Sequence, residues 1–155
     1  MEILSSCYLF KGVKSHQIDE LAKVVNEVDF EKDAWLFHEG SQADRLYFLV
    51  DGAVDLLTTI ESDVELPTAR LKIAGDCFGT GALVEPFKYS LSARCVETVS
   101  LLTIAREDLA EILEKDSELG KTVFGNLAVQ YLDRLREARQ ELKIHFKILL
   151  KVMRF

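Results

Sequence analysis

Residues 28–104 form a succession of short apolar segments separated by turn residues, and no other feature constrains the fold of this chain as strongly. Seven segments have the alternation and the residue types of strands: 28–30, 35–37, 46–50, 54–57, 69–73, 92–96 and 99–104. Asp51-Gly52 favours a tight hairpin, because glycine accepts the positive φ that such a turn needs. Residues 61–67 are expected to form a loop. Many short strands at this spacing predict an antiparallel barrel or jelly roll, with Trp35 in its core.

Helical periodicity lies on both sides of this β region. Ser15 is expected to cap a helix that runs to Val25, and a second helix is predicted over residues 106–114. A long helix, capped by Asp116 or Ser117, is predicted to continue to the C-terminus. The predicted fold is therefore mainly β with flanking helices. Residues 1–115 are expected to hold the barrel with its N-terminal and following helices, and residues 116–155 the long C-terminal helix.

A glycine-rich run at residues 75–95 carries a resemblance to a known family. It begins Gly-Asp-Cys-Phe-Gly-Thr-Gly-Ala-Leu and resembles the phosphate-binding cassette of the cyclic-nucleotide-binding domain family. Its matching positions are Gly75, Asp76, Phe78, Gly79, Ala82 and Leu83. Segments 37–40 and 46–54 match the first half of the domain, so the resemblance covers roughly residues 9–142. It implies a cyclic-nucleotide-binding-type β-jelly-roll (a double-stranded β-helix) with an N-terminal helix and a long C-terminal helix.

Two positions of the cassette depart from the family pattern. The resemblance implies a Glu for the ribose 2′-hydroxyl where this chain has Thr80, and an Arg for the cyclic phosphate where it has Tyr89. Removing one partner of a buried charge pair at a binding site typically costs ~2–5 kcal/mol. That is a loss of roughly 30- to several-thousand-fold in affinity. Binding of cAMP or cGMP through the usual contacts is therefore expected to be weak or absent.

The cassette backbone can still form an anion site. A helix N-terminus offers unpaired N–H donors, and the glycines allow a ligand to approach the backbone closely. The predicted ligand-binding residues are Phe78, Gly79, Thr80, Gly81, Ala82, Leu83, Tyr89 and Ser90. Their ligand would be a cyclic nucleotide or another small anion, and no other cofactor is implied. In the alternative interpretation the pocket is filled by its own side chains, the Tyr89 ring among them.

No pattern of catalytic or metal-binding residues stands out. His16, His38 and His145 are far apart in the sequence, and no Ser-His-Asp or Cys-His grouping can be identified. The chain is therefore expected to be neither an enzyme nor a metal protein.

The cysteines and the N-terminal segment bear on the compartment. Cys7, Cys77 and Cys95 are an odd number without metal-ligand spacing, which predicts free thiols in a reducing cytoplasm. The first residues lack the basic and apolar regions of a signal peptide, and no run of 18 apolar residues occurs.

Charge is spread unevenly along the chain. The formal net charge of −7 argues against nucleic-acid binding. Residues 143–155 nevertheless contain four basic residues and no acidic one, and Arg139, Lys143, Lys147 and Lys151 recur at four-residue steps on one face of the predicted helix. This segment, residues 139–155, is either a solvated helix face or a docking surface for a protein partner or an anionic membrane.

The long helix contains a heptad pattern of mostly apolar residues. Its positions are Phe124, Ala128, Tyr131, Leu135, Ala138, Leu142, His145, Leu149 and Val152. Steps of three and four residues are typical of a coiled-coil seam. Two interpretations follow from the resemblance: the helix folds over its own barrel as a lid, or it pairs with a second copy to form a homodimer. The length of the seam favours the homodimer.

Together these features predict a non-enzymatic sensor or adaptor module, dimeric through its last helix, with a degenerate pocket. One alternative is a true receptor for a cyclic nucleotide or another small anion with altered contacts. Another is a regulator of the transcription-factor type without its DNA-binding domain, since residues 143–155 are too few for a helix-turn-helix. The chain is accordingly expected to act on an effector in trans or to be part of a longer protein.

Overall fold

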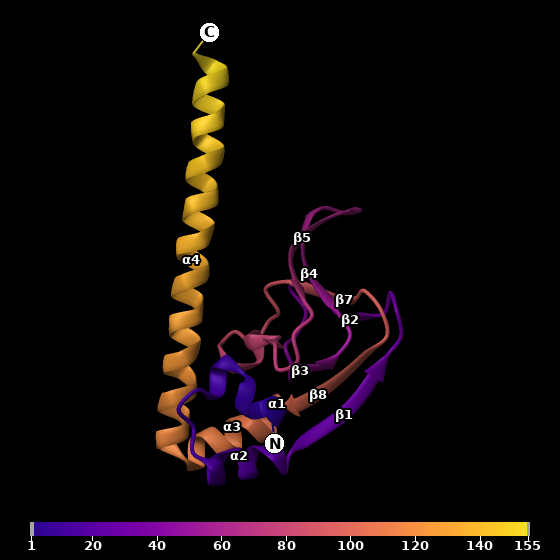
Figure 1. Cartoon of the computed structure of the whole chain (residues 1–155), viewed down its shortest axis with the longest axis vertical. Helices are drawn as coiled ribbons and strands as arrows, with labels where there is room; N and C mark the ends of the chain where they lie inside the picture. The colour runs from indigo at the N-terminus through magenta and orange to yellow at the C-terminus, as the bar shows by residue number, and fades with distance from the viewer. Residues whose placement is uncertain (1, 155) are drawn as a thin grey trace.

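Two four-stranded antiparallel sheets dominate the computed structural model, which describes residues 2–154 (Figure 1). The first sheet has the order β1 (Val25–Phe30), β8 (Val99–Ala105), β3 (Arg45–Asp51), β6 (Cys77–Phe78). The second has the order β2 (Trp35–Phe37), β7 (Ser92–Cys95), β4 (Val54–Glu61), β5 (Val64–Leu71). The predicted mainly β jelly roll with flanking helices is confirmed.

Apolar side chains from both sheets meet in one core. Leu49 and Leu101 of the first sheet pack with Val54 and Ala93 of the second, and all four are almost fully buried. Alternation of inward and outward side chains along each strand makes this possible, because successive residues of a strand point to opposite faces. In β3 both faces are buried: Leu49 points into this core, whereas Leu46 and Phe48 point to the opposite face and pack in a second apolar cluster with the helices.

Trp35 does not belong to this core, and the prediction that placed it there is wrong. Its side chain is 38% exposed at the start of β2. The indole ring lies against the ring of His38, with centroids 4.9 Å apart, and beneath the guanidinium of Arg94. A large amphipathic ring can cover surface in this way because its polar edge stays in contact with water.

The predicted loop at residues 61–67 is also wrong. Strand β4 continues to Glu61 and β5 begins at Val64, so the two form a long hairpin that projects beyond the barrel (Figure 1). Pro67 lies within β5, where it faces Leu57 of β4. Proline is tolerated here because β5 is an edge strand, whose outer side lacks a neighbour that would need the missing N–H.

The N-terminal segment consists of α1 (Glu2–Ser6), a single 3₁₀ turn η1 (Tyr8–Phe10) and α2 (Ser15–Ala22). Helix α2 ends before Val25, the predicted end of the helix, because Val25 belongs to β1 and pairs there with Ile104 of β8. Its N-cap is Lys14 rather than Ser15: the Lys14 N–H donates to Oε1 of Gln17 at 2.9 Å. The same Gln17 donates from Nε2 to the carboxylate of Asp116, which ties α2 to the C-terminal helices.

Two helices follow the barrel, α3 (Arg106–Lys115) and α4 (Ser117–Met153). Of the two predicted caps for the long helix, Asp116 is the one observed, since its carboxylate accepts the N–H of Leu119 at 3.1 Å. Leu119, Val123 and Leu127 then bury one stripe of α4 in the core. Past these turns α4 extends well clear of the rest of the chain (Figure 1). Within residues 2–154, none of the helices combines the length and apolar character that crossing a bilayer would require.

Candidate functional site

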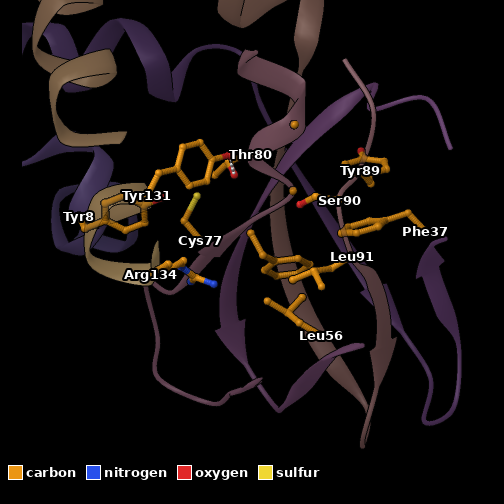
Figure 2. A pocket seen from close by; sticks show the side chains of 13 residues that line it. Tyr8, Phe37, Leu56, Cys77, Thr80, Tyr89, Ser90, Leu91, Tyr131 and Arg134 are labelled. Carbon is orange, nitrogen blue, oxygen red and sulfur yellow. Dashed lines mark hydrogen bonds between the residues drawn. The ribbon is translucent and has the colours of Figure 1, made fainter. Parts of the chain in front are cut away.

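A cavity of about 310 Å³ lies where the glycine-rich cassette, the second sheet and α4 meet (Figure 2). Its floor and walls are mainly apolar and aromatic. The lining residues are Tyr8, Phe37, Leu56, Cys77, Phe78, Gly79, Thr80, Gly81, Tyr89, Ser90, Leu91, Tyr131 and Arg134. The fold thus joins segments that are far apart in the sequence into one concave site.

Six of the eight predicted site residues line this cavity: Phe78, Gly79, Thr80, Gly81, Tyr89 and Ser90. The other two, Ala82 and Leu83, do not. They are buried in the 3₁₀ turn η2 (Thr80–Leu83) and line a separate cavity of about 560 Å³, formed with α3 and the start of α4. Their apolar side chains fix the cassette against the helices.

Two glycines of the cassette, Gly79 and Gly81, are required by the structure for different reasons. Gly79 adopts φ +79°, and a Cβ there would lie 3.2 Å from both the Tyr47 and the Tyr89 rings. At Gly81 a Cβ would collide with the carbonyl oxygen of Lys88. Close backbone packing therefore requires Gly81, in addition to any approach by a ligand. The tight turn sets the Thr80 side chain at the edge of the cavity.

Tyr89 is held by the barrel itself. Its side chain is only 3% exposed, and its ring stacks on Phe37 with centroids 3.8 Å apart and planes 14° from parallel. Its hydroxyl donates to the carbonyl of Arg45 at 2.8 Å and accepts the N–H of Arg45 at 3.2 Å. Burial raises the pKa of the Tyr89 phenol far above its ordinary value, so this side chain stays neutral. It brings no cation to the site.

Thr80 is bonded to the long helix. Its Oγ1 and the hydroxyl of Tyr131 lie 2.6 Å apart, and Figure 2 shows the Tyr131 ring extending from α4 to reach it. The Thr80 hydroxyl, which stands at the ribose-binding position of the cassette, is thus already hydrogen-bonded within the chain. Because this is one neutral hydrogen bond, it contributes a modest amount, about 0.5–1.5 kcal/mol, to holding α4 on the cassette.

Arg134 is the functional candidate that the sequence reasoning missed. It lies one turn beyond Tyr131 and extends from α4 into the pocket (Figure 2). Among the described lining residues it is the sole side chain that is charged at neutral pH. Burial raises the pKa of the Cys77 thiol well above its ordinary value, and the nearby positive charge of Arg134 opposes that shift. The buried stripe of Leu119, Val123 and Leu127, continued by helical steps, was the signal that could have placed Arg134 toward the barrel.

Within residues 2–154, no group of three or more His, Cys, Asp or Glu side chains is placed to hold a metal ion. The three cysteines are buried free thiols. The pocket itself has apolar walls with hydroxyl groups and one guanidinium at its boundary, an arrangement that suits reversible binding of a small molecule.

The family model for the cyclic nucleotide-binding domain matches residues 27–116, which is more than half of the chain. The matched range contains every strand from β2 to β8, most of β1 and all of α3. The match therefore covers the cassette and all of the barrel except the first two residues of β1.

Curated relatives carry this domain within longer proteins. Potassium channel KAT1 of Oryza sativa subsp. japonica is 35% identical over 139 residues, covering 88% of this chain and 18% of the channel. The CRP-like cAMP-activated global transcriptional regulator of Mycobacterium tuberculosis (strain ATCC 25618 / H37Rv) is 29% identical over 132 residues, covering 82% of this chain and 56% of the regulator. The chain thus spans about a fifth of the one and just over half of the other.

Solved structures agree with these matches. The catabolite activator protein of Thermus thermophilus superposes with a TM-score of 0.75 at 29% identity, covering 88% of this chain and 62% of that one. The N-terminal domain of a transcriptional regulator from Streptomyces coelicolor A3(2) gives 0.72 at 27% identity, with coverages of 89% and 95%. Fold, cassette and sequence lead to the same conclusion: the chain belongs to the cyclic nucleotide-binding domain family.

Proposed function

We propose that this chain is a non-enzymatic regulatory module that binds cAMP and cGMP weakly or not at all through the contacts usual in its family. The observation that carries the proposal is the state of Thr80 and Tyr89. One hydroxyl is bonded to Tyr131 and the other to the backbone of Arg45, so both positions are already bonded within the chain. A carboxylate for the ribose and a cation for the phosphate are both absent from these two positions.

The direct test is calorimetric titration of the purified chain with cAMP and with cGMP. We expect dissociation constants above about 100 μM, or no measurable heat, because the missing charge pair alone costs ~2–5 kcal/mol. Micromolar binding by the unaltered chain would overturn the proposal and favour a cyclic-nucleotide receptor with altered contacts.

We further infer that the module is a homodimer through α4. The seam residues Phe124, Tyr131, Leu135 and Leu142 are each between 42% and 57% exposed within one chain. Phe124 follows Val123 of the buried stripe by one residue, which is about 100° around the helix, whereas Tyr131 lies four residues after Leu127 and bonds to Thr80 of its own cassette. Leu135 and Leu142 lie beyond the buried part of α4, so this part of the seam is available to a second copy. On this proposal, residues 1–115 form the sensing part and residues 116–155 the output helix.

We also propose that the protein is cytoplasmic and that it does not bind nucleic acid. Three buried free thiols are typical of a reducing compartment such as the cytoplasm. The formal charge of −7 supports a role that does not involve nucleic acid.

A second candidate function concerns residues 139–155. Arg139, Lys143, Lys147 and Lys151 are all exposed, and the apolar residues between them are about half exposed. A dimer seam would use only part of this apolar surface, since a coiled coil needs two positions in seven. The rest of the apolar surface lies beside the basic stripe formed by Arg139, Lys143, Lys147 and Lys151. An apolar surface next to such a stripe is typical of helices that bind acidic proteins or anionic membranes.

Truncation tests this second function. The full chain is expected to co-sediment with phosphatidylserine vesicles, or to retain acidic proteins from a cell extract, more strongly than a chain ending at Leu142. The difference should shrink as salt rises, because exposed charges are screened over ~8 Å at physiological ionic strength. Neutral phosphatidylcholine vesicles are the control. Equal behaviour of the two chains would identify the stripe as a solvated face.

A further inference from the structure

Arg134 is the unexplained charge of the pocket. Among the described residues it takes part in no ion pair or hydrogen bond, although its neighbour Arg136 pairs with Asp133 and other arginines pair with nearby carboxylates. It comes from α4, whereas Tyr89, at the cassette position for a cation, is neutral (Figure 2). The pocket therefore has one positive group, and that group lies on the helix.

The shape and lining of the pocket restrict what it can hold. Most of its wall is aromatic or aliphatic, from Phe37, Leu56, Phe78 and Leu91, and an apolar body would replace water there favourably. Thr80 and Ser90 add hydroxyl groups near the cassette. At about 310 Å³, the cavity suits a small molecule with one or two rings rather than a large or highly charged one.

We propose that this pocket binds a small organic monoanion with an aromatic body, and that Arg134 of α4 is its charge partner. The positive charge that contacts the anion would therefore come from α4, and not from the cassette position that Tyr89 occupies. Such a ligand would touch the cassette with its body and α4 with its charge, so binding would act directly on the position of the helix. The inference rests on the proposed function, because it assigns a ligand to a module that lacks the usual nucleotide contacts.

The test uses 2-naphthoate and its neutral amide, 2-naphthamide, which differ mainly in charge. Calorimetry on the full chain is expected to show naphthoate binding about tenfold or more tightly than the amide, because only naphthoate can form a charge-assisted hydrogen bond with the solvent-exposed Arg134. Arg134→Gln is expected to remove this preference and leave the weak binding of the amide unchanged. Arg134→Lys is expected to keep part of it.

Arg136→Gln provides the matched control, because it removes the same charge two residues along α4, on the other side of the helix. It should leave the preference for naphthoate intact. Circular dichroism confirms that each variant is folded. The inference is overturned if the unaltered chain does not bind naphthoate, if the amide binds as tightly, or if Arg134→Gln keeps the full preference. The cAMP titration reports separately on the proposed function, so the two can fail independently.

Discussion

Leu135→Lys is expected to convert a dimer of this chain into a monomer. Leu135 lies in the middle of the proposed seam and is 46% exposed in a single chain, so a second copy of α4 would cover it. A two-fold interface places the substitution on both helices. Each dimer would then bury two unpaired ammonium groups close together, at a cost of several kcal/mol. That penalty is a large part of the free energy of a typical helical dimer.

Sedimentation velocity at micromolar concentration measures this effect directly. The unaltered chain should sediment as a dimer and the variant as a monomer. Gln140→Lys is the matched control, because it adds the same charge on the opposite side of α4 and should leave the dimer intact. If the unaltered chain is itself monomeric, α4 acts as a lid on its own barrel and the dimer proposal is wrong.

Thr80→Glu combined with Tyr89→Arg is expected to create measurable cAMP binding. The two changes supply a carboxylate for the ribose and a guanidinium for the phosphate at the positions where the family resemblance places them. A gain of about 30-fold or more over the unaltered chain follows from one restored buried charge pair. The Tyr89 change also removes a ring stacked on Phe37 and the hydroxyl bonded to Arg45, so some loss of thermal stability is expected.

Thr80→Glu with Tyr89→Gln separates charge from the loss of the ring. It disrupts the same packing but brings no cation, and it should bind cAMP no better than the unaltered chain. Circular dichroism and the melting temperature establish that both double variants are folded. If the variant with Thr80→Glu and Tyr89→Arg is folded but does not bind cAMP, the cassette backbone itself no longer fits the phosphate.

Local sequence patterns predicted most of the architecture because strand alternation and helical spacing directly reflect which side chains are buried. The prediction failed where a tertiary neighbour decides the outcome. Residues 61–67 carry acidic and turn-forming residues and Pro67, which indicate a loop, yet pairing with β4 makes them part of a hairpin. Trp35 is apolar enough for the core, but its strand position at the barrel surface is set by the register with β7.

The residues of the candidate site were likewise predictable only where they are close together in the sequence. The cassette run identified six lining residues, because they are consecutive or nearly so in the sequence. Arg134 and Tyr131 reach the pocket only because Leu119, Val123 and Leu127 fix how α4 rotates against the barrel. That rotation is a long-range property of packing. The partner of the Tyr89 hydroxyl is likewise determined by the start of β3, 44 residues away.

The continuity of α4 has a mechanical consequence. From Leu127, the last buried residue of the helix, to Met153 there are 26 residues in one unbroken helix, which is an arm of about 39 Å. Tyr131 and Arg134 contact the pocket close to the fulcrum of this arm. A tilt of about 10° at its base would shift those two residues by only about 1–2 Å but would move the far end by about 7 Å. A displacement of about 1–2 Å at the pocket would therefore be amplified several-fold at the far end of α4, where Lys151 lies.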